Sequence, residues 1–170
     1  MISLEILDVK SCMSHLLLKD TFHAFYFIEG DIATFNTFHI DGQLHKDFFD
    51  TAEAAERLQN RKFSYWKEIQ EFCYSLIKGK RTPLGMKLIF SLSDANTEKF
   101  LTQNGLAFDS HTVNGLYLNF KYDGTALKCI TGVSLSTFTL DKSLEYAWDE
   151  MVRRFFHQKE ITVKDAVGYE

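Results

Sequence analysis

The stretch GLYLNFKYDGTALKCITG, residues 115–132, carries the clearest secondary-structure pattern in this chain of 170 residues. Asp123-Gly124 is a favoured two-residue turn, and both flanking runs are rich in residues that suit strands. The stretch therefore predicts a β-hairpin. Upstream, apolar side chains occupy every second position across residues 84–92, which predicts a further strand. The stretch STFTLD, residues 136–141, is predicted to add a strand after the hairpin.

The N-terminal part of the chain has a similar pattern. Residues 2–6 predict a first strand. In FHAFYFIEGDIATFNTFHIDG, residues 22–42, two β-rich runs flank Glu29-Gly30-Asp31, and glycine favours a turn there because it tolerates positive φ. The second run then presents every second residue from 32 to 40 on one face. QLHKDFF, residues 43–49, is predicted to continue as another strand.

Helices are predicted where apolar side chains recur at helical spacing behind a capping residue. The predicted helices cover residues 9–18 after Asp8, 64–78, 94–103 after Ser93 or Asp94, and 142–157 after Asp141. Residues 51–62 predict a short helix followed by a loop. Residues 158–170 lack a pattern and are predicted to form a flexible tail.

These elements predict an α+β fold in which residues 1–157 form a single domain. Residues 2–49 and 84–140 both read as strand, helix, strand, strand, with a further strand left open, which predicts two pseudo-repeats forming mainly antiparallel sheet. The helices 64–78 and 142–157 are long and amphipathic, and they pack against that sheet in this interpretation. Another two-layer sandwich, or an unclosed barrel with helices, remains an alternative.

The composition predicts one packed domain. Hydrophobic residues make up 45% of the chain and aromatic residues 15%, so the apolar content is too high for a disordered protein. The net charge of −4 argues against a protein that coats nucleic acid through its overall charge, and a local basic face remains open.

The cysteines and the N-terminus bear on cellular location. Cys12, Cys73 and Cys129 are widely spaced and predict small buried apolar groups without a disulfide framework. The first ten residues lack a basic segment, and no apolar run reaches the ~18 residues of a membrane span. We therefore expect a cytoplasmic protein that does not bind membranes.

Basic residues gather around Pro83, the only proline, in LIKGKRTPLGMK, residues 76–87. The segment is not a phosphate-binding P-loop, because Arg81 follows Gly79-Lys80 and the predicted helix precedes the glycine. A helix stop is one explanation, with Gly79 in a left-handed conformation and cations near the helix C-terminus. The other is weak binding of an anion or a nucleic acid. The candidate residues are Lys78, Lys80, Arg81, Lys87, Arg61 and Lys62.

HIDGQLHKD, residues 39–47, holds four side chains that are weak candidates for metal ligands: His39, Asp41, His45 and Asp47. Their spacing matches no zinc pattern and no cysteine lies near, which favours a solvated hairpin edge. The chain also lacks a nucleophile motif. The sequence therefore predicts no catalytic residue and no cofactor.

Three stretches together resemble an uncharacterised family of small bacterial single-domain proteins, a domain of unknown function. They are TFNTFHIDG (34–42), LIKGKRTPL (76–84) with the upstream WKEI, and TGVSLSTFTLDKSLEYAWDEMV (131–152). The resemblance covers residues 2–156 and carries over no catalytic residue.

A second resemblance is one of pattern. The predicted repeat, with the hairpin KYDGTALKCITG (121–132), is similar to one domain of a DNA sliding clamp, a ring that holds DNA non-enzymatically and docks partner peptides. Clamp subunits join two or three such domains and this chain has one. Neither candidate inner helix, 9–18 or 94–103, is basic, so the resemblance implies protein binding on an adapted scaffold.

Three functions are therefore compatible with the sequence. The first is a non-enzymatic interaction module for a protein partner. The second is nucleic-acid association through the basic residues near Pro83. The third is an enzyme or small-ligand protein whose pocket is assembled only in the folded chain.

Overall fold

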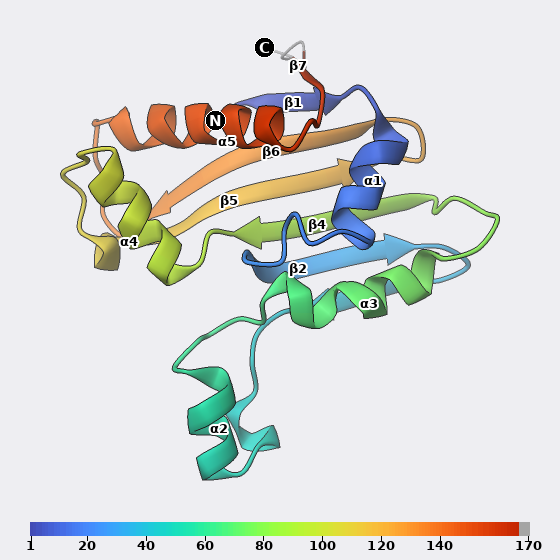
Figure 1. The fold of residues 1–170 in the computed structure, drawn as a ribbon, viewed down its shortest axis with the longest axis horizontal. Coiled ribbons are helices and arrows are strands. Elements are labelled where there is room, and N and C mark those ends of the chain that lie inside the picture. The colour runs from blue at the N-terminus through green and yellow to red at the C-terminus, as the bar shows by residue number, and fades with distance from the viewer. Residues whose placement is uncertain (167–170) are drawn as a thin grey trace.

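An antiparallel sheet of seven strands runs through the computed structural model, which describes residues 1–166, in the order β3-β2-β4-β5-β6-β1-β7 (Figure 1). The strands are β1 (Ser3–Ile6), β2 (Tyr26–Ala33), β3 (Thr37–Asp41), β4 (Gly85–Ser91), β5 (Val113–Tyr122), β6 (Leu127–Leu135) and β7 (Val163–Asp165). The helices are α1 (Val9–Leu17), α2 (Thr51–Leu58), α3 (Trp66–Ile77), α4 (Asp94–Gln103) and α5 (Ser143–Gln158), with short 3₁₀ helices η1 (Lys46–Phe48) and η2 (Ser110–Thr112). The predicted α+β class is confirmed, and the four longer predicted helices are right to within two residues.

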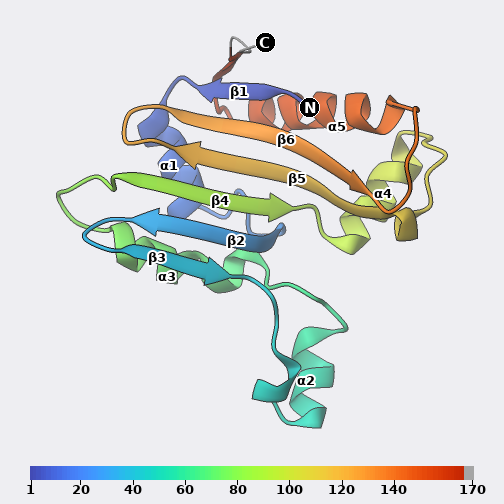
Figure 2. The same ribbon diagram turned by 180° about the vertical axis from the view of Figure 1, so that it is seen from behind.

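The helices are not distributed evenly around the sheet. α1, α3 and α5 lie on one face, and α4 lies at one end (Figure 1). Seen from behind, the strands form the front of the molecule, and within residues 1–166 no helix crosses that face (Figure 2). η1 and α2 project away from the sheet beyond β3 (Figure 2). The fold is therefore a two-layer structure with one uncovered sheet face.

The hairpin predicted from residues 115–132 is formed by β5 and β6, but its turn is shifted by one residue. Tyr122 pairs with Leu127, so Gly124 and Thr125 are the central turn residues rather than Asp123 and Gly124. The Asp123 carboxylate accepts hydrogen bonds from the backbone N–H groups of Thr125 and Ala126, at 2.9 and 2.8 Å. An aspartate at the first turn position makes these bonds, and Gly124 takes the positive φ of 96°.

The turn predicted at Glu29-Gly30-Asp31 is wrong, because these residues lie inside β2 and the chain turns at residues 34–36. Gly30 is buried, and a Cβ there would lie 2.9 Å from Cδ2 of Leu88 and 2.9 Å from the Lys87 carbonyl oxygen. The glycine permits close packing inside the sheet and does not form a turn. The strand predicted at 43–49 is also wrong: Gln43 forms one isolated bridge with Phe63, and η1 follows.

Two predictions near the C-terminus are wrong. Residues 136–141 form a loop that leads into α5, where the Asp141 carboxylate accepts a hydrogen bond from the Ser143 N–H at 2.9 Å. The predicted tail, 158–170, contains β7, which pairs antiparallel with β1, and Ile161, which is buried in the core. Residues 167–170 of that predicted tail lie outside the described residues.

The two predicted repeats share an element order but not a place in the sheet. β1-α1-β2-β3 and β4-α4-β5-β6 each read strand, helix, strand, strand. β4 pairs with β5 of its own unit, whereas β1 pairs with β6 and β7. The fourth strand expected in each unit is absent from residues 1–166. A common origin of the two units stays a prediction.

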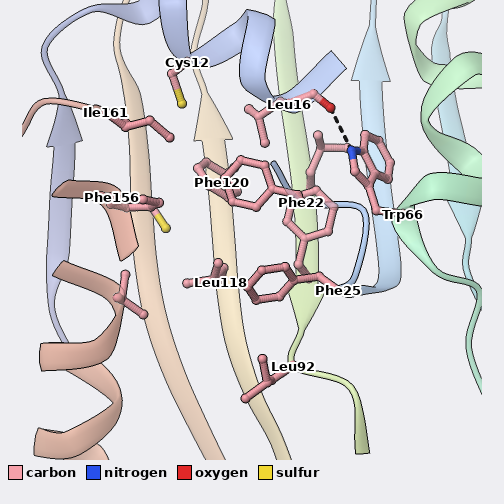
Figure 3. Packing of buried hydrophobic residues seen from close by; sticks show 14 of the residues in the cluster. Cys12, Leu16, Phe22, Phe25, Trp66, Leu92, Leu118, Phe120, Phe156 and Ile161 are labelled. Atoms are coloured by element: carbon pink, nitrogen blue, oxygen red, sulfur yellow. Dashed lines mark hydrogen bonds between the residues drawn. The ribbon is translucent and has the colours of Figure 1, made fainter. Parts of the chain in front are cut away.

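Aromatic rings fill the space between the sheet and the helices. Phe22 stacks on Phe90 with ring centroids 5.5 Å apart. Phe22 also meets Phe120 edge-on, with centroids 5.3 Å apart; both rings are labelled in Figure 3. Trp66 meets Phe90 edge-on at 5.0 Å, which joins α3 to the same cluster. Burial of such large side chains is the main favourable term in folding, and edge-on pairs add to it.

The C-terminal end of α1 is capped by side chains from α3. The Leu16 carbonyl accepts hydrogen bonds from the Trp66 indole N–H at 2.7 Å (Figure 3) and from the Gln70 amide at 3.0 Å. The Gln70 amide also donates to the Lys19 carbonyl at 2.7 Å, and its oxygen lies 2.7 Å from Nε2 of His23. Carbonyl groups at a helix end have no intrahelical partner, so these bonds fix α1 against α3.

A double-mutant cycle tests this cap. Trp66→Phe and Gln70→Met each leave one donor on the Leu16 carbonyl, and each is expected to lower the free energy of unfolding by about 1–2 kcal/mol in urea titrations. The double variant leaves that buried carbonyl without a donor, so its loss should exceed the sum of the singles by at least ~0.5 kcal/mol. Lys67→Met, on the exposed side of α3, serves as the control. Strict additivity would show that the two donors do not share an acceptor.

All three cysteines are free and buried. Burial raises the pKa of the Cys12 and Cys73 thiols to about 12, with the Asp8 carboxylate adding to the effect at Cys12. Burial also raises the pKa of Cys129 well above its ordinary value, with Cys12 adding to it. The thiolate is the reactive form, so all three groups are expected to be inert in the folded protein.

Thiol labelling tests this expectation. At pH 8 the native protein should react with an excess of a chromogenic disulfide reagent at least ~100-fold more slowly than the same protein unfolded in urea, because the raised pKa values leave little thiolate. A thiol that reacts at the unfolded rate would show that its burial is wrong.

Candidate functional site

The uncovered face of the sheet carries one row of charged side chains. Strand pairing places these residues directly opposite one another from β3 to β7, and side chains at paired positions point to the same face. The row, in spatial order, is His39, Asp31, Lys87, Lys121, Lys128, Glu5 and Lys164.

Three lysines occupy the middle of the row, and we call Lys87, Lys121 and Lys128 the lysine triad. Lys87 pairs with Lys121 and Lys121 pairs with Lys128, on three neighbouring strands. Paired positions are about 5 Å apart, and like charges at such positions destabilise a sheet. Lys87 lies 4.0 Å from a Glu29 oxygen, whereas Lys121 and Lys128 form no ion pair with any residue in 1–166. The fold therefore concentrates positive charge at the centre of this face.

A shallow hollow of about 460 Å³ lies over the triad at the hairpin end of the sheet. Its wall includes the triad and three small residues, Ala33, Gly85 and Ala126, whose short side chains leave the lysine stems accessible. Three cationic side chains and three small residues thus share the lining of the hollow with Asp31, Met86, Tyr122 and Asp123.

The two carboxylates at this hollow are already engaged. Asp31 Oδ1 lies 2.6 Å from Nδ1 of His39, and this hydrogen bond raises the pKa of the imidazole. Hydrogen bonds from the N–H groups of Ala126 and Thr125 lower the pKa of Asp123, which holds the turn. Neither carboxylate neutralises the centre of the triad.

The outer strands give the face a negative flank. Glu29 and Asp31 on β2, and Asp41 on β3, point to the uncovered side next to the triad. The face is therefore positive at its centre and negative towards β3.

The six basic residues predicted near Pro83 do not form one surface cluster. Lys78, Lys80 and Arg81 are exposed in the loop between α3 and β4, at the same end of the sheet as the β5–β6 turn (Figure 1). Lys87 belongs to the triad. Lys62 lies at a different pocket, next to Phe63. The helix stop is seen directly: α3 ends at Ile77, Gly79 has a φ of 135°, and Pro83 is buried.

Arg61 is a structural residue rather than a surface cation. Its side chain is buried, and its Nη1 donates to Glu68 at 2.7 Å while the guanidinium lies 4.3 Å from the Tyr65 ring centroid. Burial acts to raise the pKa of Glu68, but the hydrogen bonds from Arg61 and from the Tyr65 N–H outweigh it and lower that pKa. Arg61 therefore ties the start of α3 to the preceding segment.

The four metal-ligand candidates are not brought together. His39 contacts Asp31 rather than Asp41, and His45 and Asp47 lie in the segment that leads through η1. Among residues 1–166 no group of three or more His, Cys, Asp or Glu side chains is arranged to hold a metal ion.

Sequence reasoning missed Lys121 and Lys128. Their pairing follows from the hairpin register once the turn is placed at Gly124-Thr125, so the hairpin alone contains that signal. Their alignment with Lys87 depends on the pairing of β4 with β5, in which Lys87 meets Lys121, more than 30 positions along the chain.

A second and larger pocket, of about 720 Å³, lies at the opposite end of the same face. It is formed where β4 leads into α4 and where η2 leads into β5, and its lining includes Tyr26, Ser91 and Tyr117. This pocket is separate from the triad along the strands.

Among residues 1–166, no helix combines the length and apolar character needed to cross a bilayer. No curated protein and no solved structure matches the chain. A family of unknown function, DUF5721, matches residues 15–164, which confirms the prediction that the chain belongs to an uncharacterised family. This chain is therefore a member of the DUF5721 family.

Proposed function

We propose that this protein is a non-enzymatic binding module whose uncovered sheet face docks an acidic segment of a protein partner. The observation that carries the proposal is the lysine triad, in which three cations lie opposite one another without a carboxylate between them.

Charge repulsion within the triad gives the proposal its physical basis. Like charges at paired strand positions cost stability, and a bound anionic group removes that cost while it gains attraction from all three ammonium groups. The hollow above the triad gives carboxylate groups access to the Nζ atoms. The strand pairing fixes the spacing of the three lysine Cα atoms, and this spacing gives such a contact its specificity.

The chemistry favours a protein segment over a nucleic acid. The chain has a net charge of −4, and Glu29, Asp31 and Asp41 flank the triad. A phosphate backbone that crossed the face would be repelled by this flank. A protein segment can place carboxylates on the triad and cations on the flank, and such complementary patterns set specificity at interfaces.

Two expectations from the sequence belong to this proposal. Sliding clamps dock partner peptides, and the similarity of this scaffold to a clamp domain stays a prediction. Nucleic-acid association through Lys78, Lys80 and Arg81 is the competing outcome, since these exposed residues lie at the same end of the sheet as the triad.

Fluorescence anisotropy with two labelled probes tests the proposal: a peptide of six alternating Glu-Gly repeats, and an oligo-dT strand with six phosphates. The wild-type protein is expected to bind the peptide, with an affinity that falls as salt is added because exposed charges are screened. The triple variant K87Q/K121Q/K128Q is expected to lose at least tenfold in peptide affinity, because three charge-assisted contacts are removed.

The matched control is K10Q/K67Q/K99Q, which removes the same number of charges from exposed lysines on α1, α3 and α4. It should change peptide affinity less than twofold. Equal losses in the two triple variants, or tighter binding of oligo-dT than of the peptide, would overturn the proposal, the latter in favour of nucleic-acid binding.

A further inference from the structure

The second pocket on the uncovered face is built around two tyrosines and a serine. Tyr26 pairs with Ser91 and Ser91 pairs with Tyr117, so the three side chains lie in one row on neighbouring strands. The two tyrosines are two strand spacings apart, or about 10 Å, and the small Ser91 lies between them. The pocket volume of about 720 Å³ falls in the range of small-molecule sites.

Both tyrosines are held in position. The Tyr26 ring packs against Tyr65 and Phe63, with centroid distances of 5.3 and 6.5 Å, and its hydroxyl donates to Asp94 Oδ2 at 3.2 Å. The Tyr117 ring crosses Gly115, where a Cβ would lie 2.3 Å from Tyr117 Cζ. Gly115 lies at an irregularity in the pairing of β5 with β6, and such bulges reorient side chains next to functional sites.

The charged groups at the pocket are mainly acidic. Asp94 and Glu98 lie one turn apart on α4 and both line the pocket, whereas Lys62 is its one lysine among the described residues. Burial raises the pKa of Tyr26 to about 12, so its hydroxyl stays a proton donor to Asp94 and adds no negative charge of its own. His111 also lines the pocket.

We propose that this pocket binds a small organic cation that carries an alkylammonium group. Aromatic faces attract ammonium groups through their quadrupoles, and carboxylates at the same site supply the opposite charge. Ser91, Ser110 and Asn114 add hydroxyl and amide groups that can orient polar substituents of the ligand. This site is independent of the lysine triad and of the docking function assigned to it.

Choline and its neutral isostere 3,3-dimethyl-1-butanol provide the test, because they share a shape and differ in charge. Nuclear magnetic resonance titration of the full chain is expected to show saturable shifts of the Ser91, Asn114 and Gly115 amides with choline, and at least tenfold weaker effects with the isostere. The amides of Gly85 and Lys121, at the other end of the face, should not shift.

Two variants test the aromatic ring and the carboxylate separately. Tyr117→Leu removes one ring, and Glu98→Gln removes one exposed carboxylate; each is expected to weaken choline binding at least threefold. Glu71→Gln, on the exposed side of α3, is the matched control and should bind choline as the wild type does. The variant K87Q/K121Q/K128Q should also retain choline binding, which separates this test from the test of the triad. Equal binding of the isostere, full binding by Tyr117→Leu, or binding of inorganic phosphate at the same amides would overturn the proposal.

Discussion

The pairing register of β4, β5 and β6 is the constraint on which the rest of this structure depends. Lys87, Lys121 and Lys128 pair on the uncovered face, and their neighbours Leu88, Phe120 and Cys129 pair on the face that packs against the helices. Because side chains alternate along a strand, a slip of one residue would bury lysines and expose the core. The same register therefore builds the hydrophobic core and assembles the candidate site. Burial of the apolar face offsets the destabilisation that repulsion between the lysines causes.

The parts of the fold that were predictable are those with a local cause. Alternation across residues 84–92 and helical spacing in 64–78 and 142–157 each identify an element by its own buried side. Gly30 was misread because the close approach of Leu88 comes from a strand almost 60 residues away. The strand β7 was missed since three residues carry no periodicity, and its pairing with β1 is seen only in the folded chain.

The candidate site was predictable only in part, for the same reason. Lys87 was singled out as one of several cations near Pro83, yet its relevant neighbours are across the sheet rather than along the chain. Arg61 was counted with that group because a sequence does not show that its guanidinium is buried against Glu68 and Tyr65. The aromatic pocket left no local signal, because Tyr26, Ser91 and Tyr117 come from three separate segments. The cap of α1 also left no local signal in the sequence, since Trp66 and Gln70 donate to the Leu16 carbonyl from about 50 residues away.

The lysine triad is a set of directly opposed cations, and the stability of the variant Lys121→Glu is the decisive measurement of that arrangement. This substitution converts two like-charge pairs into two opposite-charge pairs, between strands whose backbone is unchanged. The free energy of unfolding at low salt should rise by about 1 kcal/mol, and the gain should disappear at 1 M salt, while Lys99→Glu in the middle of α4 should show neither effect. A loss of stability in Lys121→Glu, or a gain that salt does not remove, would contradict the register and the candidate site together.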